Sequence, residues 1–334
     1  EGIPDADMRA GSGLIVESCE NGGDDQQNLS DVTIASDGNG NSASIIGDNN
    51  LHIENLNVKI NVKKGRWYFF AFPWDVPMDK ISMQNGCDYI FRYYDGATRA
   101  EIGAGSSWKN VNDMKLKAGV GYIFQCDRPC DVIFPIPVEL HSKILTTESV
   151  TLPLVAHPSD NKANKGWNYV GNPYPSFYDI YYMDFTAPIT VWEGNTYRAY
   201  SITDDDYVLN PMQGFFVQKP DAIDAITLQS AGRQVEWTVK RPKATPSKTR
   251  NSSAAERNIF NIEIGCDTTM DMTRVVLNDC ADLAYEIECD AAKFMSMNSE
   301  VAQIYTLDSE RNKLSINERP EDNKSIALGV YLPA

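Results

Sequence analysis

Two stretches of the chain carry the same three short motifs in the same order, and this repetition constrains the fold more than any other feature. The motifs pair residues 64–74 (KGRWYFFAFPW) with 165–175 (KGWNYVGNPYP), 94–99 (YDGATR) with 192–198 (WEGNTYR), and 121–125 (GYIFQ) with 214–218 (GFFVQ). The three anchors recur at similar offsets in the same order. A tandem duplication of one β-rich module explains this pattern better than chance does.

Composition limits the classes of partner. The chain has 334 residues, which is enough for two or three domains with real cores, and a net charge of −16 from 46 acidic and 30 basic side chains. Such a surface repels phosphate backbones and anionic membranes, so we expect no nucleic-acid partner. Since no stretch of 18 apolar residues occurs, we also expect no membrane insertion by a helix.

The apolar pattern is mostly that of β-strands. Residues 51–62 alternate apolar and polar side chains, as a half-buried strand does. Further strands are predicted at 14–16, 32–34, 122–125, 132–134, 149–154, 226–228, 235–239, 259–264, 273–277 and 325–332. Turn residues separate them every 8 to 15 residues, which favours β-sandwiches over βαβ units. One short helix is expected at 290–297.

The predicted fold class is all-β, with tandem β-sandwich modules, a C-terminal β-sandwich and an irregular N-terminal β segment. The boundaries are 1–62 for the N-terminal segment, 63–147 and 148–240 for the two repeats, 241–256 for a basic linker, and 257–334 for the C-terminal sandwich. The N-terminal segment either packs on the first repeat or forms the last coils of a solenoid. We expect the chain to be part of a longer protein.

Two of the seven cysteines lie close together in sequence. Cys126 and Cys130 flank a three-residue turn between two predicted strands. A hairpin there brings their Cβ atoms within bridging range, so either a disulfide or two free thiols is expected. Without a nearby His or second Cys pair, this spacing is a poor zinc signature.

Several motifs carry a resemblance to known proteins. Residues 67–73, 166–175 and 212–217 resemble modules of large secreted or surface-exposed Bacteroidetes proteins, which often precede the sorting domain of the gliding-associated (type IX) secretion system. Residues 290–293, 303–307 and 314–317 are similar to the β-sandwich unit that follows such modules. The resemblance implies an extracellular or cell-surface location and a modular β architecture, and it carries no agreed catalytic residues.

No motif in the sequence identifies a catalytic reaction. The three histidines, His52, His141 and His157, are not near a nucleophile motif, and there is no nucleophile elbow, zinc-protease motif or phosphate-binding glycine loop. A pair of carboxylates for glycoside hydrolysis can meet in space from anywhere in the chain. The prediction is that the protein is not an enzyme.

Aromatic residues are dense in the second repeat. Eleven occur between residues 167 and 200. Aromatic faces offer a sugar ring an apolar platform, and tyrosine hydroxyls can bond its rim. Phe177, Tyr178, Tyr181 and Tyr182 have no counterparts in the first repeat and are the candidate ligand-binding residues. The alternative is that these rings fill the core.

Calcium is the one cofactor that the sequence indicates. Asp37, Asn39 and Asn41 place oxygen ligands at every second residue, and Asp48 stands at the twelfth position. This spacing is similar to that of a calcium loop, although the sixth position is Ser42 and not glycine. A plain glycine and asparagine loop is the alternative. A second acidic run, 204–206, is expected to be a solvated hairpin tip.

These patterns favour a non-catalytic extracellular surface or adhesion protein that presents a glycan-binding or protein-binding surface. The alternative is an accessory module region of a larger secreted hydrolase that acts on polysaccharide or protein. A structural spacer is a third possibility, because stacked repeats extend reach and offer broad surfaces.

Overall fold

The structure is a computed structural model that describes residues 6–8, 13–15, 27–36, 42–47, 51–83, 86–105, 107–141, 145, 148–238, 257–266, 269–279, 281–322 and 325–333. Strands dominate these residues, so the predicted all-β class is confirmed. Their one α-helix is α1 (Gly96–Ile102), capped by the carboxylate of Asp95. None of the helices in these ranges has the length and hydropathy that a membrane crossing requires.

The first half of the chain contains two stacked sheets. Across the sheets, the order is β1 (Ala6–Met8), β3 (Gln27–Ser36), β5 (Leu51–Val62), β13 (Cys130–Ile136) and β8 (Ser82–Met83) in one, and β10 (Trp108–Asn110), β9 (Tyr89–Tyr94), β12 (Gly121–Cys126) and β6 (Tyr68–Ala71) in the other. Strands β11 (Lys115–Leu116) and β7 (Val76–Pro77) pair as a separate two-stranded antiparallel sheet. Buried rings of Phe70, Phe124 and Phe134 close the core between the two sheets.

The N-terminal strands form a parallel stack that continues into this sheet. Strand β5 pairs in parallel with β3 and antiparallel with β13, and β1 pairs in parallel with β3. A second parallel pair joins β2 (Gly13–Ile15) to β4 (Ser44–Ile46). The prediction of a half-buried strand over 51–62 is confirmed. Parallel strands that follow one another in the chain are typical of solenoid coils, and here they also pack on the first half.

The second half repeats this arrangement. Its sheets are β14 (Val150–Pro153), β22 (Ala225–Leu228) and β17 (Met183–Asp184); β15 (Trp167–Gly171), β21 (Gly214–Gln218), β18 (Ile189–Trp192) and β19 (Tyr197–Tyr200); and β20 (Val208–Leu209), β16 (Phe177–Asp179) and β23 (Arg233–Gln234). A separate apolar core lies between the first two of these sheets. The strand predicted over 235–239 is wrong for 235–238, where the chain bends after β23.

The strand pairings of the two halves correspond in chain order. The order β10-β9-β12-β6 matches β19-β18-β21-β15, β5-β13-β8 matches β14-β22-β17, and β11-β7 matches β20-β16. The clearest difference is α1, which follows β9, whereas a short turn follows β18. Residues of the repeated motifs therefore stand at equivalent places in equivalent sheets.

The two four-stranded sheets pack against each other through aromatic side chains. Tyr169 of β15 lies over the strand β12 at Gly121, where an added Cβ would come within 2.1 Å of its ring. The ring of Phe216 lies 4.5 Å from that of Tyr169, and Trp108 meets Tyr169 edge to face at 5.4 Å. The backbone N–H of Ala71 donates to the carbonyl of Met212 at 3.0 Å. Some rings of the repeated motifs thus serve the contact between the halves, and others, such as Phe70 and Phe215, fill the core of one half.

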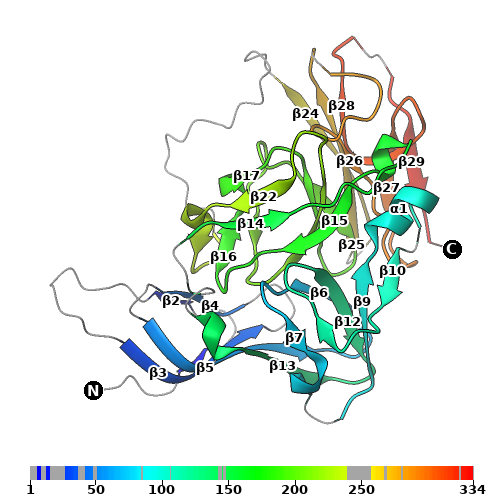
Figure 1. The fold of residues 1–334 in the computed structure, drawn as a ribbon. Coiled ribbons are helices and arrows are strands. Elements are labelled where there is room, and N and C mark those ends of the chain that lie inside the picture. Colours follow the sequence, from blue (N-terminus) through cyan, green and yellow to red (C-terminus); the bar gives the residue numbers. More distant parts are fainter. Residues whose placement is uncertain are drawn as a thin grey trace.

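The C-terminal unit is a six-stranded sheet at the opposite end of the molecule from the N-terminal strands (Figure 1). Its strands are β24 (Asn258–Cys266), β25 (Thr269–Leu277), β26 (Ala291–Ala292), β27 (Gln303–Leu307), β28 (Lys313–Arg319) and β29 (Leu328–Tyr331). The helix predicted over 290–297 is wrong, because residues 291 and 292 pair as a strand with β28. The predicted linker, 241–256, lies outside the described residues.

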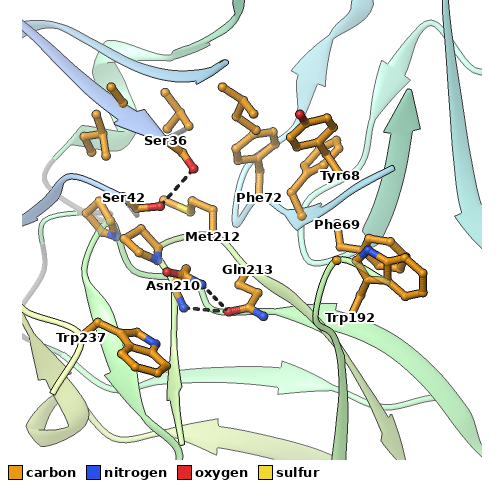
Figure 2. Close-up of a pocket in the computed structure, with 18 of the residues that line it drawn as sticks. Ser36, Ser42, Tyr68, Phe69, Phe72, Trp192, Asn210, Met212, Gln213 and Trp237 are labelled. Atoms are coloured by element: carbon orange, nitrogen blue, oxygen red, sulfur yellow. Dashed lines mark hydrogen bonds between the residues drawn. The ribbon is translucent and has the colours of Figure 1, made fainter. Parts of the chain in front are cut away.

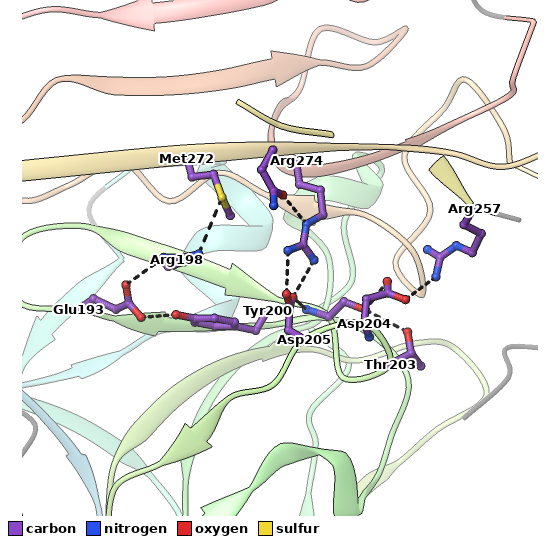
Figure 3. A network of polar contacts seen from close by, with 11 residues as sticks. Glu193, Arg198, Tyr200, Thr203, Asp204, Asp205, Arg257, Met272 and Arg274 are labelled. Atoms are coloured by element: carbon purple, nitrogen blue, oxygen red, sulfur yellow. Dashed lines mark hydrogen bonds and ion pairs between the residues drawn. The ribbon is translucent and has the colours of Figure 1, made fainter. Parts of the chain in front are cut away.

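Ion pairs tie this sheet to the second half (Figure 3). Arg274 donates to both carboxylate oxygens of Asp205 at 2.8 and 2.7 Å, and Arg257 bridges Asp204 and Glu318 at 2.7 and 2.8 Å. The expectation of a solvated tip at 204–206 is therefore wrong for Asp204 and Asp205, whose carboxylates face arginines of a distant part of the chain.

Candidate functional site

A cavity of about 430 Å³ lies where the N-terminal strands and the two halves meet. Its walls come from β3, β5 and β6 on one side and from residues 207–213 on the other. The volume falls in the range of about 300–1,000 Å³ that small-ligand pockets occupy. The position of the cavity follows from the packing of the two halves. The motif that ends in Pro175 and the segment before β21 both turn toward the first half at the cavity.

Tryptophans mark opposite ends of this cavity (Figure 2). Trp192 stacks on Phe69 with ring centroids 5.1 Å apart and an interplanar angle of 17°. Trp237 is 57% exposed, and its indole N–H donates to the carbonyl of Val208 at 2.8 Å. The half-buried Trp67 also lines the cavity, with the Arg92 guanidinium 5.2 Å from its ring centroid. These rings present apolar faces that are held in place by their neighbours.

Amide side chains form the polar part of the wall. The Gln213 carbonyl oxygen accepts from the backbone N–H and the side-chain amide of Asn210 at 2.8 and 3.0 Å. The Gln213 amide donates to the Tyr207 hydroxyl at 3.1 Å. The buried Oδ1 of Asn210 accepts no hydrogen bond from the described residues. The cavity wall therefore contains a fixed amide network, and a few ordered polar groups among apolar ones are typical of ligand pockets.

Charged side chains also line the cavity. Arg66 and Glu193 both line the cavity. The Glu193 carboxylate accepts a hydrogen bond from the Tyr200 hydroxyl and lies 4.0 Å from the Arg198 guanidinium. Burial raises the pKa of Tyr200, and the negative charge of Glu193 raises it further, so this phenol stays protonated as a donor. These groups can orient a polar ligand by hydrogen bonds and charge.

The structure places the four residues of the predicted aromatic platform in two different environments. Phe177 and Tyr178 are 4% and 0% exposed and belong to the core of the second half. Their ring faces cannot reach a ligand, so they are corrected to core residues. Tyr181 and Tyr182 are half-buried and meet edge to face at 5.4 Å. For these two tyrosines, ligand binding stays a prediction.

The predicted calcium ligands, Asp37, Asn39, Asn41 and Asp48, all lie outside the described residues, so calcium binding there stays a prediction. Ser42, at the sixth position of that loop, is described, and its hydroxyl donates to Ser36 at 3.1 Å in the wall of the cavity.

The histidines take structural roles or lie apart. Both ring nitrogens of the buried His141 face backbone carbonyls, those of Ile53 at 2.6 Å and Ile136 at 3.0 Å. His52 is exposed on β5. Burial lowers the pKa of His157, although Asp95 opposes the shift.

Sequence reasoning missed the cavity itself. The sequence indicated Trp67 only as part of the repeated motif and did not indicate Trp237 as a site residue. The cavity joins segments more than 150 residues apart, and only the fold brings them together. The alternating residues around Trp237 predict a strand, so the sequence gives no separate signal for a binding role of this side chain.

Comparison with known proteins adds no assignment. No protein-family model, curated protein or solved structure matches the chain. The function is therefore argued from the cavity and from the arrangement of its residues.

Proposed function

We propose that the protein is a non-catalytic extracellular binding protein that takes a glycan in the cavity between its two halves. The observation that carries the proposal is the pair of tryptophans, Trp192 and Trp237, at opposite ends of a cavity whose wall is an ordered amide network (Figure 2). A pyranose ring has apolar faces and a rim of hydroxyls. Aromatic planes with amide donors and acceptors between them are complementary to both features.

The architecture supports the same proposal. We infer that the two halves are a tandem duplication of one β-sandwich module, because their strand pairings correspond in order. Joining two such modules creates a cavity at their junction that one module lacks. The extracellular location is proposed from the resemblance of the repeated motifs to secreted Bacteroidetes modules, and it suits a chain whose charge repels nucleic acids.

The test is a glycan array with the full chain, followed by titration of each hit with tryptophan fluorescence as the readout. Trp237→Ala should lower affinity by about tenfold, which corresponds to about 1.4 kcal/mol. Trp237→Phe, which keeps an aromatic face, should retain most of the affinity. Trp67→Ala should also weaken binding, since this ring lines the cavity.

The matched control is Tyr181→Ala with Tyr182→Ala, which removes the other aromatic surface and leaves the cavity intact. Thermal melts of every variant confirm that the fold is retained. The proposal fails if no glycan binds, or if affinity is lost in the tyrosine variant and unchanged in Trp237→Ala.

A further inference from the structure

In the core of the first half, Cys87 meets the neighbouring pair Cys126 and Cys130, about 40 residues further along the chain. The Sγ atoms of Cys87, Cys126 and Cys130 all lie within 4.8 Å of one another, and those of Cys87 and Cys130 are 3.1 Å apart. All three are free thiols and are 8%, 1% and 6% exposed. The bridge considered for Cys126 and Cys130 is thus not formed, and a third thiol joins them.

The fold fixes these positions through strand pairing. Cys126 ends β12 opposite Tyr89 of β9, so the segment before β9 brings Cys87 alongside. Cys130 begins β13, which pairs with β8 at Met83. The thioether sulfur of Met83 lies 3.7 Å from the Cys87 Sγ. Four sulfur atoms from three separate segments therefore gather at one end of the core.

The module does not need cysteines at this place to fold. The equivalent hairpin of the second half, between β21 and β22, is closed by an ion pair of Lys219 with Asp224 at 3.1 Å. Residues 148–238 contain no cysteine. The same strand ends can thus be joined without sulfur, and the three thiols are a feature of the first half alone.

We propose that Cys87, Cys126 and Cys130, with Met83 beside them, form a binding site for one Cu(I) ion. Thiolate and thioether sulfur are the soft ligands that Cu(I) prefers. A structural Zn²⁺ site takes four Cys, His or carboxylate ligands. Among the described residues, no histidine or carboxylate joins this group of three thiols.

The distances suit a single ion held by three sulfurs. With metal–sulfur distances of about 2.3 Å, three sulfur atoms in a plane around one ion lie about 4 Å apart. All three sulfurs lie within 4.8 Å of one another, and the 3.1 Å between the Sγ atoms of Cys87 and Cys130 would widen by about 1 Å around the ion. A disulfide would use two of the sulfurs and leave the third thiol buried without a role.

Three buried sulfur ligands favour a soft cation of low charge. Each thiol that binds as a thiolate releases its proton to solvent as the metal–sulfur bond forms. The single positive charge of Cu(I) then offsets one of the thiolate charges.

The test uses the reduced full-length chain under anaerobic conditions, titrated with Cu(I) against a chromophoric Cu(I) chelator. We expect one Cu(I) per chain by native mass spectrometry, protection of three thiols from alkylation, and a higher melting temperature, because the ion binds only the folded chain. Cys126→Ser should abolish the bound ion. Met83→Leu, which keeps the apolar volume, should weaken binding by about tenfold.

Cys289→Ser is the matched control, since this half-buried cysteine of the C-terminal unit lies outside the cluster. If Cys126→Ser does not fold, the wild-type titration, the alkylation pattern and Met83→Leu decide the question. The proposal is overturned if the chelator removes all Cu(I), if Zn²⁺ is retained and Cu(I) is not, or if peptide mapping of the wild-type chain finds two of the three cysteines joined as a disulfide.

Discussion

A buried ion pair in the C-terminal unit gives the sharpest prediction on stability. The Lys293 ammonium donates to both carboxylate oxygens of Asp271 at 2.6 and 2.7 Å, with side chains 0% and 2% exposed. Asp271 also accepts from the Thr196 hydroxyl at 3.1 Å and from the backbone N–H of Ile304 at 2.8 Å. Because Thr196 belongs to the second half, this carboxylate also joins the two units.

Lys293→Met removes the cation and keeps the volume of the side chain. Breaking a buried ion pair from one side typically costs about 3–5 kcal/mol, because the remaining charge is left uncompensated. Two hydrogen-bond donors to Asp271 remain in the variant. We therefore expect a loss near the lower end, about 3 kcal/mol of unfolding free energy.

The assay is urea unfolding at pH 7, followed by tryptophan fluorescence. Lys117→Met is the control, because the Lys117 and Asp113 side chains are 58% and 59% exposed and their ion pair is screened by water. The control should unfold at the wild-type urea concentration. The reasoning is refuted if Lys293→Met costs less than about 1 kcal/mol, the size of an ordinary surface pair.

Two further predictions concern acidity and packing. Burial raises the pKa of Asp290 to about 7, and the hydrogen bond from the backbone N–H of Glu318 partly counteracts this shift. The folded state thus holds this proton more tightly than the unfolded chain, whose aspartates have a pKa of about 3.9. The unfolding free energy of the wild type, relative to Asp290→Asn, should therefore fall by about 1.4 kcal/mol per pH unit between about pH 4 and 7; a difference independent of pH would contradict it. Gly121→Ala should cost about 1–3 kcal/mol in thermal unfolding, because its Cβ would lie 2.1 Å from the Tyr169 ring. Gly105→Ala, with no atom within 4 Å of the new Cβ, is its control, and equal melting of the two variants would argue against this packing.

Local patterns were sufficient to predict many of the strands. Residues 51–62 alternate in the sequence except at the polar pair Glu54 and Asn55, and the apolar set faces the core along most of β5. Patterning of this kind is decided within the strand itself, because side chains alternate between faces with a period of two. The fold class follows from many such segments.

The helix expected over 290–297 failed because distant partners determine that segment. The Asp290 carboxylate accepts backbone N–H groups of Glu286 and Glu318, and Lys293 points to Asp271. Helix propensity is a weak preference that tertiary contacts override. None of these partners can be read from the eight residues themselves.

The candidate sites show the same limit. The chemistry of the aromatic cluster was visible, but Tyr178 is buried in a core that forms only when β16 pairs with β20 and β23, whose paired residues stand 29 to 57 positions further along the chain. Cys87 stands 43 residues before Cys130, so only the pairing of β9 with β12 reveals the cluster of three thiols. Residue types indicated what each site can do, and the sheet topology decided which residues meet.

The double pairing of β5 has a mechanical consequence. Nine residues of β3, between Gln27 and Ser36, lie side by side with β5 in parallel register. If the chain is held at Gln27 and pulled at Val62, tension runs along both strands and loads their interstrand bonds together in shear. Such a joint has to break all at once, whereas a hairpin pulled from its open end unzips bond by bond. The junction between the N-terminal strands and the first half should therefore resist a larger pulling force than a hairpin of the same length.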